Sequence, residues 1–359
     1  MTETCIALLG KKDTPTDAVE EYSRYLSAAL RPHDMQIEIH RIQWDVLGWS
    51  DSLKLLRQQS IAWKNRWVLV QYTALGWSSR GFPQKLIHVL EILRSVDARV
   101  GIVFHDVHPY TGQRPIDFLR RFIQVRIMRT ATLASDIAVF TVPPEKLSWL
   151  SDVPPTAVFV PVGPNLPIPS KTSPARSLVP TVGVFSITGG KAGIDETSTI
   201  LRCIRGASQK LGRLRLSVFG RGADLHETDL RDGLSGLPVE LTVEGIIDPQ
   251  KVVERLSTID VLLFVRGHIS SRRGSAIAAI ACGCPVIAYS GLETGAPITN
   301  AGIVLVSPDQ PDELNGALVR VLSDDTFRKD LATRSRIAYQ EYFSWEAIAY
   351  RLSVFLKAR

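Results

Sequence analysis

Short apolar stretches rich in β-branched residues alternate with longer stretches of helical period along the whole chain. Apolar runs of this kind predict parallel strands buried on both faces, and the segments between them predict helices. In the first such segment, positions 19, 22, 26 and 30 are apolar and fall on one helical face. The chain is therefore expected to be an α/β protein. The predicted strands are 6–9, 37–39, 67–70, 100–104, 137–140 and 157–160 in the first half, and 182–185, 214–219, 239–243, 261–265, 285–289 and 303–306 in the second.

A proline-rich segment separates the two sets of strands. Proline at this density continues neither a helix nor a central strand, so we place a domain boundary there. We expect two Rossmann-like, doubly wound domains, residues 1–165 and 166–340, each presenting the carboxyl ends of its strands to a crevice where ligands bind. The prolines of this segment are Pro161, Pro164, Pro167, Pro169, Pro174 and Pro180.

Composition agrees with two folded domains and excludes several other classes. The chain has 359 residues, of which 45% are hydrophobic and 22% charged, which is ordinary for a globular protein. The net charge of +6 is too small to indicate nucleic-acid binding. Apolar runs stay short of the roughly 20 residues of a membrane-spanning helix and the start shows no signal-peptide pattern, so a cytoplasmic location is expected. The cysteines lack zinc-ligand or disulfide spacing and are interpreted as reduced core residues; they are Cys5, Cys203, Cys282 and Cys284.

A glycine-rich turn follows the first predicted strand of the second half. Residues 186–193 read Ser-Ile-Thr-Gly-Gly-Lys-Ala-Gly and lead into a helix. Backbone N–H groups at such a turn, the positive end of the helix and the charge of Lys191 together favour a phosphate. A plain tight turn between strand and helix is the alternative. The sequence has neither the Walker pattern nor the dinucleotide fingerprint G-x-G-x-x-G, which argues against a nicotinamide cofactor.

A second basic turn follows the predicted strand 261–265. Residues 270–275 read Ser-Ser-Arg-Arg-Gly-Ser and open a helix of small residues that ends at Gly283. Two arginines at the N-terminus of a helix that follows a buried strand favour a diphosphate. The alternative is that Arg272 and Arg273 are solvated surface charges.

The order of several short segments resembles glycosyltransferase family 4, whose fold is of the GT-B type. The most specific segment, residues 279–288, reads Ala-Ile-Ala-Cys-Gly-Cys-Pro-Val-Ile-Ala and is similar to the family's Glu-Ala-Met-Ala-Cys-Gly-x-Pro-Val. The resemblance covers nearly the whole chain. It implies two domains that face a cleft and a C-terminal helix, residues 341–359, that packs back on the first domain. The other matching segments are 220–222 (Gly-Arg-Gly), 243–246 (Val-Glu-Gly-Ile), 259–263 (Ile-Asp-Val-Leu-Leu) and 343–348 (Phe-Ser-Trp-Glu-Ala-Ile).

The chain departs from the family at the positions that hold the donor. The family commonly carries two glutamates eight positions apart, and alignment places Ser270 and Ala278 there, so the chain resembles a divergent member. Of the family's arginine and lysine on the diphosphate, the lysine corresponds to Lys191 and the arginine position holds Ser186. We hypothesise that Arg272 and Arg273 supply the missing positive charge.

Two segments of the first half suggest roles in the same reaction. His105 and Asp106 end the predicted strand 100–104 and are similar to the family's histidine turn beside the transferred sugar; the histidine can bond sugar hydroxyls or transfer a proton. A structural role for His105 is the alternative. The loop 71–83 is rich in aromatic residues, among them Tyr72 and Trp77, and is assigned to the acceptor, although it can equally be a packed aromatic loop.

Residues 115–129 combine four arginines with large apolar side chains. Such a stretch suits peripheral contact with anionic lipid at the inner face of the membrane, and a packed helix with a solvated basic edge is the alternative. The arginines are Arg120, Arg121, Arg126 and Arg129.

The resemblance implies transfer of a glycosyl group from a nucleoside diphosphate sugar to a hydroxyl of a glycan, a lipid-linked glycan or a small molecule, with retained configuration, as in polysaccharide biosynthesis. We expect no metal, because the sequence shows no metal-ligand cluster and the GT-B arrangement does not need one. We expect no cofactor, because the nucleotide sugar is a co-substrate. A catalytically degenerate nucleotide-sugar-binding protein and a sugar-nucleotide epimerase are the alternatives, and the oligomeric state is not predicted. The expected catalytic residues are His105, Lys191, Arg272 and Arg273. The expected donor-binding residues are Gly10, Ser186, Gly189, Gly190, Lys191, Gly220, Ile246, Ser270, Ser271, Gly274 and Ser275, and the expected acceptor-binding residues are Tyr72, Trp77 and Asp106.

Overall fold

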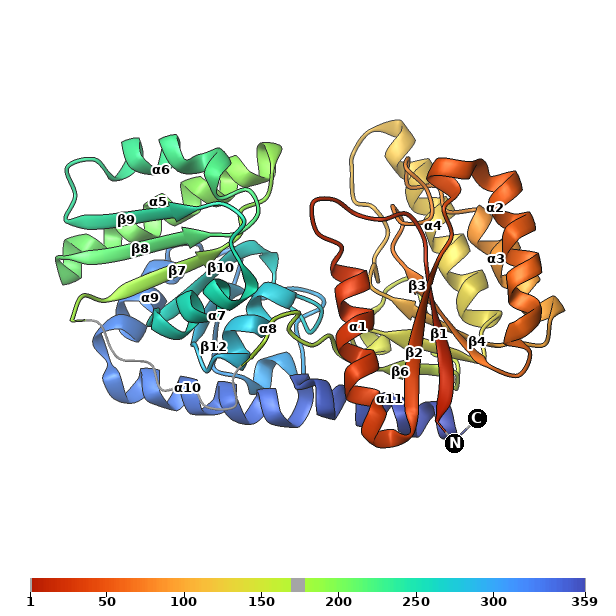
Figure 1. The fold of residues 1–359 in the computed structure, drawn as a ribbon. Coiled ribbons are helices and arrows are strands. Elements are labelled where there is room, and N and C mark those ends of the chain that lie inside the picture. The colour runs from red at the N-terminus through yellow and green to blue at the C-terminus, as the bar shows by residue number, and fades with distance from the viewer. Residues whose placement is uncertain (1, 169–177, 359) are drawn as a thin grey trace. The chain divides into compact units, whose positions relative to one another are not determined.

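The computed structural model describes residues 2–168 and 178–358. The chain divides into two compact units (Figure 1). Unit 1 comprises Met1–Pro161 and Trp345–Arg359, and unit 2 comprises Val162–Ser344. Each unit contains a six-stranded sheet whose strands are all parallel.

The sheet of unit 1 has the strand order β2-β1-β3-β4-β5-β6. Its strands are β1 (Glu3–Leu9), β2 (Met35–Arg41), β3 (Trp67–Tyr72), β4 (Arg99–Phe104), β5 (Ile137–Phe140) and β6 (Ala157–Phe159). Its helices are α1 (Ala18–Leu30), α2 (Trp44–Ser60), α3 (Lys85–Ser95), α4 (Pro115–Leu133) and α11 (Trp345–Lys357).

Both faces of this sheet are covered by helices. Alternate residues of the strands, such as Ile6 and Leu8, join one apolar core with side chains of α2, α3 and α4. On the other face α1 packs beside α11, the helix that returns from the end of the chain (Figure 1). Trp345 of α11 stacks on Tyr25 with ring centroids 5.6 Å apart. The strands carry apolar residues on both faces because both faces are buried.

The sheet of unit 2 has the strand order β12-β11-β10-β7-β8-β9. Its strands are β7 (Thr181–Phe185), β8 (Leu214–Phe219), β9 (Val239–Glu244), β10 (Val261–His268), β11 (Val286–Tyr289) and β12 (Ile303–Val306). Its helices are α5 (Gly190–Leu211), α6 (Glu227–Leu234), α7 (Pro249–Thr258), α8 (Gly274–Ala281), α9 (Glu313–Ser323) and α10 (Asp325–Ala338), and a π-helical turn, Tyr339–Phe343, leads towards α11.

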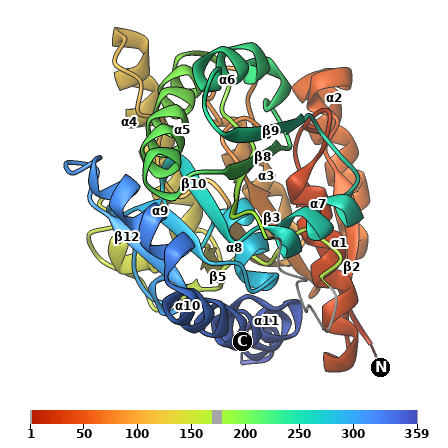
Figure 2. The same ribbon diagram turned by 90° about the vertical axis from the view of Figure 1, so that its left-hand side faces the viewer.

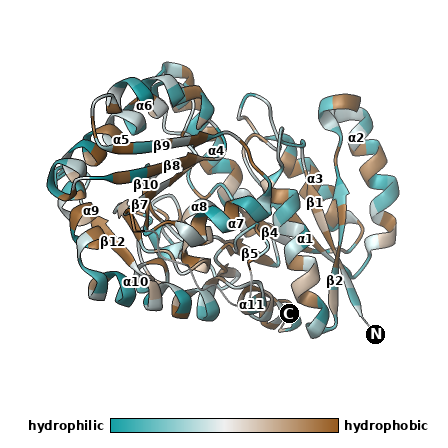
Figure 3. Cartoon of the chain, turned by 60° about the vertical axis from the view of Figure 1, so that its left-hand side comes forward, coloured by the Kyte–Doolittle hydropathy of each residue, from teal (hydrophilic) through white to brown (hydrophobic). Residues whose placement is uncertain are grey.

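Two separate apolar cores sandwich this second sheet. Residues of α5, α6 and α9 form one core, and residues of α7 and α8 form the other. Figure 2 shows α5 and α9 on one side of the strands and α7 on the other. Colouring by hydropathy shows apolar strands and hydrophilic outer surfaces on helices such as α10 (Figure 3).

The expected α/β class and the twelve predicted strands are confirmed, with ends that differ by a few residues. The C-terminal helix α11 packs on α1. The units meet in sequence at Pro161 and Ser344, a few residues from the expected boundaries. Pro169 and Pro174 lie outside the described residues. Across residues 2–168 and 178–358, every helix is too short or too polar to cross a membrane.

Each sheet has one point where the strand order reverses. In unit 1 the first strand, β1, lies between β2 and β3. In unit 2 the first strand, β7, lies between β8 and β10. Crossover helices on either side of such a point lie on opposite faces of the sheet, which leaves a crevice at the carboxyl ends of the strands where ligands bind. The turns after β1 and β3, and those after β7 and β10, are therefore the candidate ligand-binding turns of the two units.

Candidate functional site

The turn after β7 is tight and leads directly into α5. Ser186 has a positive φ of 69°, which is uncommon for a residue with a side chain, and its N–H donates to Phe219 O at 2.7 Å. A Cβ at Gly193 would lie 1.8 Å from Thr188 O, so only glycine lets the turn close on the helix. Glu196 accepts a hydrogen bond from Thr188 N at 2.8 Å and holds the turn against α5.

The first turn of α5 places the predicted phosphate ligands at the surface. Gly189 is the N-cap of the helix, and Gly190 and Lys191 are exposed in its first turn. The N-terminal N–H groups of a helix have no partner within the helix, so an anion can accept from them.

The turns after β8 and β9 are tied to the turn after β7. Gly220 N lies within hydrogen-bond distance of both Glu244 O and Gly245 O, at 3.1 and 2.9 Å. Ile187 N donates to Arg221 O at 3.1 Å. Three neighbouring turns thus form one connected edge, which brings Gly220 together with the turn of Ser186, and Ile246 lies exposed just beyond it.

The arginine pair after β10 does not contribute two free charges. The guanidinium of Arg272 makes a two-bond ion pair with Glu293, with both N···O distances at 2.7 Å. The Nε of Arg273 donates to His268 O at 3.2 Å. Burial, followed by repulsion from Arg272, lowers the pKa of Arg273 to about 10, which leaves it charged at neutral pH. Arg273 is therefore a half-buried cation held by a neutral carbonyl, whereas the charge of Arg272 is balanced.

Arg266 is a further cation of this edge, and the sequence pattern does not single it out. Its side chain is half-buried, and its Nε lies 3.5 Å from Thr188 Oγ1 in the turn after β7. Burial lowers its pKa, Glu196 opposes that effect and Arg221 adds to it. β10 extends three residues beyond the predicted strand 261–265, so the structure places Arg266 within the strand, whereas the apolar pattern ends before it. The one available signal was a charge at the end of an apolar run.

Neither position of the missing glutamates offers a carboxylate. The Oγ of Ser270 is fully buried and, within the described residues, has no hydrogen-bond partner. Ala278 lies on the buried face of α8, in the apolar core. Ser271 is also buried, whereas Gly274 and Ser275 form the first turn of α8.

Unit 1 has a pocket of about 470 Å³ at its own switch point. The turn after β1 supplies Lys11, Lys12 and Asp13, and the turn after β3 supplies Thr73, Leu75 and Ser79, among the lining residues. A Cβ at Gly10 would lie 2.1 Å from Gly76 O, so glycine is needed where the two turns touch. Gly10 therefore shapes this pocket of unit 1.

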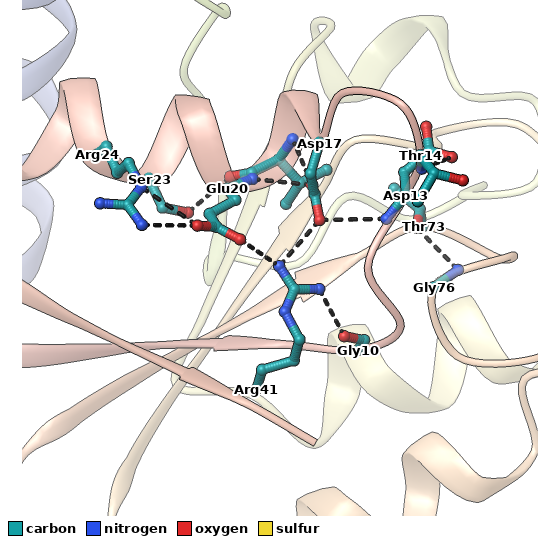
Figure 4. Close-up of polar contacts among 11 residues, drawn as sticks. Gly10, Asp13, Thr14, Asp17, Glu20, Ser23, Arg24, Arg41, Thr73 and Gly76 are labelled. Carbon is teal, nitrogen blue, oxygen red and sulfur yellow. Dashed lines mark hydrogen bonds and ion pairs between the residues drawn. The ribbon is translucent and has the colours of Figure 1, made fainter. Parts of the chain in front are cut away.

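An ion-pair network fixes one wall of this pocket (Figure 4). Arg41 donates to Asp17 Oδ2 at 2.9 Å, to Glu20 Oε2 at 2.8 Å and to Gly10 O at 2.8 Å. Asp17 also caps α1 by accepting from the N–H groups of Val19 and Glu20. Side chains from β2 and α1 thus hold the turn that follows β1.

His105 and Asp106 lie at the end of β4, beside this pocket. Gln71 Nε2 donates to Leu69 O, so its Oε1 is the acceptor for His105 Nε2 at 2.8 Å. Burial lowers the pKa of His105 to about 4, which makes the ring neutral at physiological pH. Asp106 lines the pocket, and its Oδ2 accepts from Ala74 N at 2.8 Å. Gln71 and Asp106, rather than His105 itself, form the pocket surface.

The prediction that Tyr72 and Trp77 bind the acceptor is wrong, because both side chains are buried. Both rings are only 1% exposed and lie in the apolar core of unit 1. Tyr72 packs on Phe104, and Trp77 donates its Nε1–H to Gln71 O at 2.8 Å. Tyr72 is the last residue of the buried strand β3, and Trp77 is buried in the turn that follows, so neither ring offers a face to a sugar.

We find no group of three or more His, Cys, Asp or Glu side chains that could hold a metal ion in residues 2–168 and 178–358. The charged groups that gather at the switch points are instead arginines, lysines and paired carboxylates. They suit an anionic or hydroxyl-rich ligand.

Comparison with known proteins identifies the fold. No protein-family model matches the chain, and no curated protein matches its sequence. HepE from Anabaena, crystallised with UDP and glucose, is 12% identical, with a TM-score of 0.66 over 99% of this chain and 100% of that chain. A glycosyltransferase from Rickettsia africae is 13% identical, with a TM-score of 0.71 over 99% and 98%. A proposed UDP-N-acetylglucosamine 2-epimerase from Listeria monocytogenes is 12% identical, with a TM-score of 0.61 over 100% and 96%. The protein has the GT-B fold.

Proposed function

We propose that the protein is a glycosyltransferase that moves a sugar from a nucleoside diphosphate sugar to a hydroxyl acceptor, with retained configuration. Unit 2 binds the donor and unit 1 binds the acceptor. The observation that carries the proposal is the cationic edge of unit 2. There Arg273 and Arg266 lie half-buried beside the turn that joins β7 to the N-terminus of α5. Structural likeness to HepE, which was crystallised with UDP and glucose, supports a uridine nucleotide as the first donor to test.

The chemistry requires stabilisation of a departing diphosphate. The leaving group gains negative charge in the transition state, and fixed cations and helix N-termini lower its energy most effectively where water is partly excluded. Arg273 and Arg266 hold their charge at half-buried positions, and Lys191 adds an exposed charge in the first turn of α5. The backbone N–H groups at Gly274 and Ser275 complete this set. Arg272 acts through its ion pair with Glu293, which holds the turn in place.

The pocket of unit 1 suits a hydroxyl-rich acceptor. Its lining includes carboxylates of Asp13 and Asp106, amines of Lys11 and Lys12, and the hydroxyl of Thr73. Carboxylate and hydroxyl oxygens accept hydrogen bonds from sugar hydroxyls. His105 is neutral and is a positioning residue in this proposal, because it holds Gln71 at the pocket surface through the 2.8 Å contact.

Calorimetric titration with UDP, GDP and ADP sugars, followed by an assay of released nucleotide, tests the proposal. A glycosyltransferase binds at least one donor and releases nucleotide faster when an acceptor is added. A protein that binds none of the donors, or that binds one equally well after Arg266→Ala and Arg273→Ala, contradicts the proposal. Exposed Arg231, paired with Glu227 on α6, provides the matched control, Arg231→Ala.

A sugar-nucleotide epimerase is the second candidate, favoured by the likeness to the Listeria protein. An epimerase changes the configuration of the donor sugar without any acceptor, so analysis of the recovered sugar by chromatography separates the two activities. A catalytically degenerate binding protein, favoured by the absence of carboxylates at Ser270 and Ala278, binds the donor and leaves it intact in both assays.

A further inference from the structure

The first two turns of α4 present large apolar side chains to solvent. Ile116, Phe118, Leu119 and Phe122 are 46%, 58%, 50% and 64% exposed. The opposite face of the same helix buries Ile127 and Met128 in the core of unit 1. Single exposed apolar residues are common, but four within seven positions form a patch of the kind that marks an interaction surface. We name these four residues the α4 patch.

Arginines border the α4 patch. The guanidinium of Arg121 lies 5.5 Å from the ring centroid of Phe118, and its Nε donates to Tyr110 O at 3.3 Å. Arg126 lies one turn beyond Phe122 and is exposed. The acid of this helix, Asp117, is buried and paired with Arg120. The exposed surface of α4 is therefore both apolar and cationic.

The α4 patch adjoins the loop that lines the pocket of unit 1. Arg120 donates to Arg80 O at 2.9 Å, and Gln124 donates to Gly81 O at 2.8 Å. The same loop supplies Thr73, Leu75 and Ser79 to the pocket, and Leu75 is 63% exposed. A surface that docked on α4 would therefore lie next to the pocket.

We propose that α4 docks unit 1 on the surface of an anionic lipid bilayer. The α4 patch enters the interfacial region, and Arg121 and Arg126 contact lipid phosphates. Apolar side chains bordered by arginine are the combination that interfacial helices use, because burial of apolar area and attraction to anionic headgroups add. Charge complementarity selects this occupant, since the helix carries four arginines against one neutralised carboxylate. The inference goes beyond the proposed activity and does not depend on it.

Vesicle co-sedimentation of the full chain tests the proposal. We expect binding to vesicles of equal parts phosphatidylcholine and phosphatidylglycerol, weaker binding to phosphatidylcholine alone, and a decrease with added salt. Phe118→Ser with Phe122→Ser, and separately Arg121→Glu with Arg126→Glu, each lower the bound fraction at least about tenfold. The matched controls are Val46→Ser with Ile61→Ser, which are 75% and 70% exposed elsewhere on unit 1, and Arg57→Glu on α2. Both controls keep the binding of the parent chain.

Three outcomes overturn the proposal. In the first, the parent chain does not sediment with either vesicle. In the second, the phenylalanine variant sediments as well as the parent. In the third, the Val46→Ser and Ile61→Ser control loses as much binding as the phenylalanine variant. Sedimentation velocity without lipid can give a fourth. In that outcome the parent chain forms a dimer, the phenylalanine variant is a monomer, and neither binds vesicles. That result would assign the α4 patch to a second copy of the chain. Circular dichroism of each variant establishes that the helix content is retained.

Discussion

Arg273 and Arg266 keep a positive charge at half-buried positions, and this makes them sensitive reporters of anion binding. A buried cation is costly unless an anion approaches it, and a hydrogen bond to a charged group contributes about 1.5–3 kcal/mol. Arg273 bonds a neutral carbonyl, and the Nε of Arg266 lies 3.5 Å from the hydroxyl of Thr188. In the proposed function, both residues would gain from a bound diphosphate.

We predict that Arg273→Ala weakens UDP binding by roughly tenfold or more, because a charge-assisted contact of about 1.5–3 kcal/mol is lost. Arg273→Lys restores part of the affinity by returning the charge without the planar fork. Calorimetric titration of UDP measures both effects. Equal affinities for the parent chain and Arg273→Ala would remove this residue from the donor site.

His105 gives the stability of unit 1 a pH dependence of known sign. Its pKa lies near 4 in the folded chain against an ordinary value of 6.5, so between these pH values the unfolded chain binds a proton that the folded chain does not. The free energy of unfolding therefore falls as the pH drops from about 6.5 towards 4, by about 3 kcal/mol at most for this group.

We predict that His105→Gln flattens the profile of unfolding free energy over this pH window. Urea titrations at several pH values measure the slope for both chains. Above the window neither state binds the proton, so the two curves run parallel there and serve as the internal control. Parallel curves throughout the acid range would show that the folded histidine titrates normally.

The start of α1 couples a helix cap to the wall of the pocket in unit 1. Asp17 accepts hydrogen bonds from two N–H groups of the helix and pairs with Arg41 (Figure 4). Asp17→Ala removes both interactions and is expected to cost about 2–3 kcal/mol, whereas Asp17→Asn keeps the cap and costs about 1 kcal/mol. The surface pair of Asp51 and Lys54 provides the control, since Asp51→Ala costs about 0.5 kcal/mol or less. Urea unfolding measures all three, and equal values for Ala and Asn would exclude the cap as a source of stability.

The contact between the turns after β1 and β3 depends on the absence of one side chain. A Cβ at position 10 would overlap Gly76 O, so Gly10→Ala forces the two turns apart and is expected to cost at least about 2 kcal/mol. Gly316 in α9 has open space around its Cα, and Gly316→Ala is expected to stabilise by about 0.5–1 kcal/mol. Urea unfolding measures both variants, and the change in unfolding free energy should have opposite signs for Gly10→Ala and Gly316→Ala. A neutral Gly10→Ala would mean that the turns separate freely.

On the scale of the whole molecule, the tryptophans report on one unit. All seven belong to unit 1, at positions 44, 49, 63, 67, 77, 149 and 345. Tryptophan fluorescence therefore follows the unfolding of unit 1, and circular dichroism follows both units.

We predict that a chain ending at Ser344 loses the folded state of unit 1. The truncation removes α11, whose Ile348 and Leu352 are buried, and exposes the apolar face of α1. It also removes the acceptor of the Trp67 Nε1–H, which is Leu356 O at 3.3 Å. The fluorescence transition should move to much lower urea, while unit 2 keeps its own transition by circular dichroism. An unchanged fluorescence midpoint would show that α11 is dispensable.

The strands could be predicted because parallel strands buried on both faces leave a local signature. Each predicted run of apolar residues became a strand of one of the two sheets. Site residues were harder to predict. The local pattern places Tyr72 in a loop, whereas β3 continues through it, and the pattern does not mark Arg266 because β10 continues past the apolar run. The ends of strands depend on neighbouring strands, which a local pattern does not contain.

What the sequence alone determined is the alternation of strands and helices, the two-unit division and the turns that carry glycine and charge, since these follow from the chemistry of adjacent residues. Tertiary structure decided which charges remain available. Glu293 lies 21 residues from Arg272 and neutralises it, whereas Arg266 and Arg273 keep a net charge beside the turn after β7. Electrostatic pairing depends on distance in space, and only the folded chain brings distant carboxylates and guanidinium groups within reach of each other.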